Sequence, residues 1–196
     1  MDAIETLMGE HRIIERGIDA LTAFADETRR GAADDKQELG RFVEFIRQFA
    51  DGCHHGKEED ILFKAMVEAG FPSQGGPIAV MLHEHDVGRG FVKRLADLAA
   101  QAAPWSAQDR EALAEAAHGY ANLLRQHIHK EDDILYPMAE QHLPPQVMER
   151  VDQACRRYEE EKTGSGEHER LHQLAEALVA RHVPALPRQK APHAHG

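Results

Sequence analysis

The sequence predicts an all-α protein in which four long helices form an up-down-up-down bundle, followed by a helical extension and a disordered tail. Two observations support this fold class. Four segments, the first from about residue 3 to residue 30, carry apolar residues three or four positions apart, and none alternates with a period of two. Glycine and proline residues separate these segments by short connections, which favours antiparallel neighbours.

Cap and turn residues mark the other three segments in order. Asp35 and Glu38 resemble a capping box at the start of the second segment, and Gly70 ends it. The third segment begins after Gly76, and Ser106 is a good N-cap for the fourth. Each bundle helix therefore has its own start or stop signal in addition to its apolar stripe.

We expect the chain to have three parts. Residues 1–143 are predicted to form the bundle domain, residues 144–183 a helical extension, and residues 184–196 a disordered tail. Within the extension, the pattern predicts a charged helix over 146–162 and a short amphipathic helix over 167–182, joined by a Gly-Ser-Gly linker. We expect no chemistry in the extension or the tail.

Charge and composition argue against several classes of protein. The chain has 34 acidic and 23 basic residues, for a formal net charge of −11, so we expect no nucleic-acid partner. The longest run without a charge, residues 69–82, is rich in glycine and cannot span a membrane. Residues 1–12 lack a signal-peptide core, and Cys53 and Cys155 make no disulfide framework, so we expect a cytoplasmic protein.

Histidine is the residue type that indicates function. Of the 14 histidines, four lie on the apolar faces of the four segments: His11, His54, His85 and His127. Glu58 and Glu131 each follow one of them by four residues, on the same helix face. A lone histidine on such a face is usually a hydrogen-bonded core residue. Four imidazoles and two carboxylates buried together without a cation are costly, and these faces carry no lysine or arginine.

The pattern therefore predicts a site for two metal ions. His55 lies at the margin of its stripe, so the second helix has two possible registers, His54 with Glu58 or His55 with Glu59. Imidazole and carboxylate ligands without thiolate favour iron or manganese over zinc, with zinc and copper as alternatives. The remaining histidines of the bundle lie off the stripes: His83, His118, His129 and His142.

The candidate ligands recur in two halves of the chain. The pair Glu10-His11 recurs as Glu84-His85, and the stretch 54–63 recurs as 127–136. Two helical hairpins related by a pseudo-two-fold axis would place equivalent residues at the same depth in the bundle. That is the geometry that a two-metal site needs.

These stretches, over roughly residues 5–140, resemble the hemerythrin-like proteins, in particular the bacterial type with an HHE cation-binding domain. The resemblance implies a non-haem, oxo- or hydroxo-bridged di-iron centre that binds O₂. It implies as metal ligands His11, His54, His55, His85 and His127, with Glu58 and Glu131 as bridges. One departure lies in the third helix, where oxygen-carrying hemerythrins place two histidines. Here Met81 and Arg89 flank the single His85.

Three functions follow from this pattern as hypotheses. The first is a binding protein for O₂, NO or peroxide that serves in sensing, storage or protection. The second is a di-iron peroxidase or ferroxidase, and the third is an iron- or redox-responsive regulatory module whose fold depends on its metal. We expect binding rather than turnover, two iron ions as cofactor with manganese or zinc as alternatives, and no membrane partner.

Overall fold

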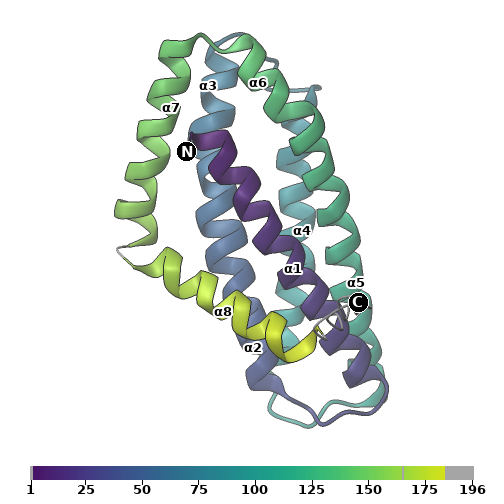
Figure 1. The fold of residues 1–196 in the computed structure, drawn as a ribbon. Coiled ribbons are helices and arrows are strands. Elements are labelled where there is room, and N and C mark those ends of the chain that lie inside the picture. The colour runs from purple at the N-terminus through teal and green to yellow at the C-terminus, as the bar shows by residue number, and fades with distance from the viewer. Residues whose placement is uncertain (1, 165, 184–196) are drawn as a thin grey trace, which may run out of the picture.

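All the regular elements found in residues 2–164 and 166–183, the part of the chain that the computed structural model describes, are helices (Figure 1). Those labelled α are α-helices and those labelled η are π-helices. In chain order they are α1 (Ala3–Arg29), α2 (Lys36–Phe45), η1 (Ile46–His55), η2 (Glu58–Leu62), α3 (Phe63–Glu68), α4 (Pro77–Ala100), α5 (Ala107–Lys130), η3 (Glu131–Leu135), α6 (Tyr136–His142), α7 (Pro145–Tyr158), η4 (Glu159–Thr163) and α8 (Glu167–His182).

Four helical rods form the bundle. The first is α1, the second runs from α2 to α3, the third is α4, and the fourth runs from α5 to α6 (Figure 1). The predicted cap residues begin these helices: Ser106 forms a capping box with Asp109, and the Asp35 side chain accepts from the Glu38 N–H at 2.9 Å. The predicted all-α bundle is therefore confirmed.

The second and fourth rods contain π-helical stretches where the candidate ligands lie. η1 ends at His55, η2 begins at Glu58, and η3 begins at Glu131. A π-helix closes its hydrogen bonds from residue i to i+5, so it turns less per residue than an α-helix. Neighbouring side chains such as His54 and His55 can therefore point to the same side of the rod.

The apolar core is divided into two clusters of buried residues. One contains Phe42, Phe49 and Leu21, and the other contains Leu7 and Met66. The buried histidines and glutamates belong to neither cluster, and all of them except His182 of α8 lie on the same four rods. Burial of these large apolar side chains stabilises the fold by about 25 cal/mol per Å² of apolar area removed from water. This stabilisation offsets the cost of burying the polar centre, which does not stabilise the fold by itself.

The extension consists of two helices that pack on the bundle. Both α7 and α8 contact α1, and Figure 1 shows α8 crossing that helix. The predicted disordered tail, residues 184–196, lies outside the described residues. Among the helices that are described, none is long and apolar enough to cross a bilayer.

Candidate metal centre

Buried side chains from all four rods form two groups whose potential ligand atoms lie within 4.8 Å of one another. One group, which we call the two-histidine subsite, consists of His11, His54, Glu58 and Glu131. The other, the three-histidine subsite, consists of His55, Glu58, His85 and His127. The structure thus brings together every ligand candidate named from the sequence, and Glu58 belongs to both subsites.

Glu131 also reaches both subsites. Its Oε2 lies 3.3 Å from Nε2 of His11, and its Oε1 lies 3.2 Å from Nε2 of His127. Oε2 of Glu58 lies within 3.7 Å of one Nε2 atom from each subsite. Both carboxylates therefore lie between histidines of different subsites, as bridging ligands must.

Each of the five imidazoles has a carboxylate beside its Nδ1 atom. The pairs are His11–Asp132 at 2.7 Å, His54–Glu10 at 2.9 Å, His55–Asp51 at 3.3 Å, His85–Glu59 at 2.7 Å and His127–Glu84 at 2.9 Å. A carboxylate that accepts Nδ1–H fixes the tautomer and leaves the Nε2 lone pair available to a metal. Sequence periodicity identified the imidazoles but did not assign these partners.

Several buried polar atoms in the centre have no hydrogen-bond partner among the described residues. They include Oε2 of Glu58 and both carboxylate oxygens of Glu131. In addition, the Nε2 atoms of His85 and His127 lie 3.0 Å apart, with a carboxylate beside each Nδ1 atom, so a proton or a metal cation must lie between the two Nε2 atoms. Unpaired buried acceptors are costly, and a cation between them satisfies all of them. The donor set fits a metal ion.

The pKa shifts of the buried groups in the metal-free protein also indicate a site for a cation. Burial and the neighbouring charge of Glu131 raise the pKa of Glu58 well above its usual range. Burial also acts to raise the pKa of Glu131, but His127 and His11 outweigh it and hold that pKa well below its usual range. Burial and the nearby His11 lower the pKa of His54 to about 4. The two bridging carboxyls are therefore shifted in opposite directions, as expected for two close buried acids without a cation between them.

The two subsites differ at one pair of repeat-related aromatic residues. Tyr136 stacks on His11 with ring centroids 5.5 Å apart, and Phe63 stacks on His85 at 6.2 Å. The Tyr136 hydroxyl donates to Oε1 of Glu58 at 2.6 Å and lies 3.5 Å from Nε2 of His11. The repeat aligns these two aromatic positions in sequence but does not show that one hydroxyl faces a bridging carboxylate.

The C-terminal extension reaches the surroundings of the two-histidine subsite. Lys57 is fully buried, pairs with Glu10, and donates to Glu159 of η4 at 2.5 Å. His168 of α8 lies 3.2 Å from Glu10. Periodicity missed this buried cation, because Lys57 lies outside the apolar stripe. Two side chains of the extension, Glu159 and His168, therefore contact Lys57 and Glu10, the residues that surround His54.

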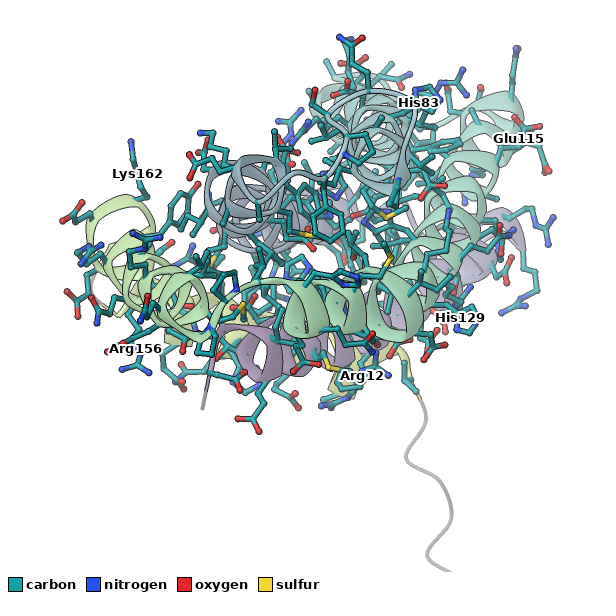
Figure 2. All side chains as sticks on the ribbon, turned by 90° about the horizontal axis from the view of Figure 1, so that it is seen from above. Arg12, His83, Glu115, His129, Arg156 and Lys162 are labelled. Carbon is teal, nitrogen blue, oxygen red and sulfur yellow. The ribbon has the colours of Figure 1, made fainter. Side chains whose placement is uncertain are left out.

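The second helix was expected to direct either His54 with Glu58 or His55 with Glu59 toward the centre, and the structure combines the two alternatives. His54 and His55 are both buried, because the π-helical turn carries both toward the centre, and Glu58 serves both subsites. Glu59 is hydrogen-bonded to His85 and belongs to neither subsite. The histidines expected to point outward, His83 and His129, lie at the edge of the molecule in Figure 2.

The fold and the paired histidine–carboxylate centre define a class of helical-bundle proteins that bind cations. The model of the hemerythrin HHE cation-binding domain matches residues 2–139, and the chain belongs to this family. Three curated relatives, uncharacterized proteins of Mycobacterium bovis and of two strains of Mycobacterium tuberculosis, are each 28% identical over 138 residues. These matches cover 69% of this chain and 52% of each relative, so the chain spans about half the length of the curated relatives.

Proposed function

We propose that this chain holds two metal ions, iron foremost, in the two-histidine and three-histidine subsites, with Glu58 and Glu131 as bridges. One observation carries the proposal: three buried carboxylate oxygens without hydrogen bonds lie among imidazole Nε2 atoms whose Nδ1 atoms are already engaged. Imidazole and carboxylate ligation suits iron and manganese, and zinc is a third occupant that this chemistry accepts.

The loaded centre is proposed to bind O₂ or a related small ligand, NO or peroxide, for sensing, storage or protection. Iron, when bound, supplies the redox chemistry that such ligands need. The chain contributes unequal ligand sets, so the two metals have different numbers of histidines. It also contributes the Tyr136 hydroxyl as a buried hydrogen-bond donor beside the two-histidine subsite.

The first test is metal content of the untagged chain after anaerobic loading with iron, with absorption spectra before and after admission of air. We expect two irons per chain and visible bands that vanish on reduction and return in air. Glu131→Gln should lose most of the bound iron because both subsites depend on this carboxylate. His129→Ala is the matched control, since His129 is exposed and lies outside the centre. A chain that binds no iron, or a single zinc ion, would contradict the proposal.

A second candidate function, peroxide turnover, is favoured by one specific observation. Reduction of peroxide consumes protons, and the Tyr136 hydroxyl is a donor at the edge of the two-histidine subsite. With an added electron donor that supplies the two electrons each peroxide needs, steady-state consumption of hydrogen peroxide by the iron-loaded chain should then exceed that of free iron and fall in Tyr136→Phe. Stoichiometric binding without turnover would leave the binding function and remove this one.

A further inference from the structure

A cavity of about 320 Å³ opens against the three-histidine subsite, between η1, α4 and α5. His55, His85 and His127 form its inner end. The two-histidine subsite does not contribute to it: neither His11 nor His54 lines the cavity. Access from outside therefore reaches the centre on the side that has more histidines.

The cavity is elongated along the bundle axis. On α5 it extends from His127 back to Tyr120, and on α4 it extends from His85 to Lys93. At a rise of 1.5 Å per residue, seven or eight residues correspond to a length of roughly 10–12 Å. Its total volume is about ten times the roughly 30 Å³ that one water occupies in the liquid, so it is much larger than a diatomic ligand needs.

The middle of the cavity is apolar. Val92 and Leu124 contribute side chains, and Gly88 contributes none. A Cβ atom at Gly88 would lie 3.4 Å from the Tyr120 ring, so a larger side chain at this position would enter the space. This region has the chemistry to hold a hydrocarbon chain rather than a polar ligand.

The cavity offers an uncommitted donor in its middle part and an uncommitted cation at its outer end. The buried Tyr120 lines the cavity, and its hydroxyl makes no hydrogen bond with any described residue. Arg47 is exposed at the same end and has no ion-pair partner in the described part of the chain.

The carboxylates that line the cavity are already paired. Asp51 pairs with Arg89 at 2.8 Å, and Glu84 pairs with Lys130. Neither acid is therefore left to neutralise Arg47, and the charge that remains at the outer end is positive. That charge is complementary to an anion.

We propose that this cavity binds a medium-chain monocarboxylate. Its carboxylate lies beside Arg47 at the outer end, and its chain runs along Val92 and Leu124 toward the three imidazoles. The inference rests on the proposed metal centre in one respect only, which is that a metal ion lies near the terminal methyl group of the bound monocarboxylate. The cavity and its cation are independent of metal.

The first experiment is a calorimetric titration of the full chain with butanoate, hexanoate, octanoate and decanoate. Kd should fall about fourfold for each added methylene until the cavity is filled, as expected for burial of hydrocarbon. Arg47→Gln should raise the Kd of octanoate about threefold to fivefold, the usual effect of an exposed ion pair. Arg94→Gln, an equal charge change on exposed α4 surface that does not line the cavity, should leave it unchanged.

The second experiment locates the far end of the chain. Octanoate fluorinated at its terminal methyl group is bound to protein loaded with Co²⁺ or with Zn²⁺, and its fluorine resonance is recorded. Cobalt, but not zinc, should shift and broaden the resonance because the terminal group lies near the three-histidine subsite. A resonance that cobalt leaves unchanged would overturn the proposed orientation.

The two proposals fail differently. Absence of octanoate binding, or equal binding by Arg47→Gln and wild type, overturns the cavity proposal whatever the metal content. A chain that takes up no metal but binds octanoate with the predicted dependence on Arg47 overturns the metal centre and supports the cavity proposal.

Discussion

The two halves of the bundle have nearly the same chemistry but different surroundings. Glu10 and Glu84 each orient a histidine of the neighbouring rod, and each is paired with a lysine, Lys57 or Lys130. In the first half this lysine is fully buried under η4, whereas the Lys130 side chain is 33% exposed. The extension thus closes one half, while the other half opens to the cavity. The charge pairs at these equivalent positions therefore differ in strength, because two charges interact more strongly when they are buried than when they are exposed to water.

Acidification acts on the buried charges of the first half and should have the largest effect. Burial and His11 lower the pKa of His54 to about 4 from 6.5, and hydrogen bonds from His168 and His54 outweigh burial to lower the pKa of Glu10 from 4.5. Lowered pKa values mean that the unfolded chain binds protons that the folded chain does not, so stability falls as pH falls. The raised pKa of Glu58 acts in the opposite sense above about pH 4.5, so we expect the metal-free chain to lose stability mainly below about pH 4.5.

Urea unfolding of the metal-free protein at a series of pH values measures this effect. A midpoint that stays constant between about pH 5 and pH 3 would contradict it, since the unfolded chain takes up protons in that window that the folded chain does not.

Removal of each lysine tests the comparison directly. Lys57→Met leaves Glu10 buried without its cation, and we expect the free energy of unfolding to fall by about 3 kcal/mol. Lys130→Met removes the counterpart pair, which is partly exposed, and should cost about 1 kcal/mol or less. Chemical denaturation of both variants gives the difference. Equal losses would mean that the extension does not change the environment of the first half.

The carboxylates that hold the Nδ1 atoms allow each subsite to be perturbed separately. Asp132→Asn alters the partner of His11, and Glu59→Gln alters the partner of His85. Each change should weaken metal binding at its own subsite about tenfold to a hundredfold, the usual effect of such partners. Competition with a chelator should then show one weakened and one unchanged metal in each variant. Equal weakening of both metals would show that the two subsites are not separable.

A small effect is expected from a chemical difference between the halves at one aromatic position. Tyr136→Phe removes the hydrogen bond to Glu58 and makes this position identical to its counterpart, Phe63. A buried hydrogen bond of this kind contributes about 1 to 2 kcal/mol, which thermal unfolding of the metal-free variant should reveal. Iron-loaded Tyr136→Phe should also show altered absorption bands. An unchanged unfolding temperature would mean that this hydroxyl adds nothing to stability.

Local signals were sufficient for the helices and their ends. Ser106 and Asp35 begin the helices that they were predicted to begin, because a cap acts on backbone groups within one turn. The repeat also identified the ligand candidates, since buried histidines on four stripes have few explanations other than metal. His55 was more difficult, because an α-helical wheel assumes a rotation per residue that the π-helical η1 does not have.

Sequence alone determined the all-α bundle, its helix ends, and the histidines and glutamates that form the candidate centre, because helical periodicity and caps are local properties. Only the tertiary structure decided the partner of each Nδ1 atom, the burial of Lys57 and the position of the cavity. These depend on contacts between residues far apart in the chain. The extension shows this most clearly: Glu159 meets Lys57 only because α7 and η4 fold back onto the bundle, and no local pattern encodes that contact.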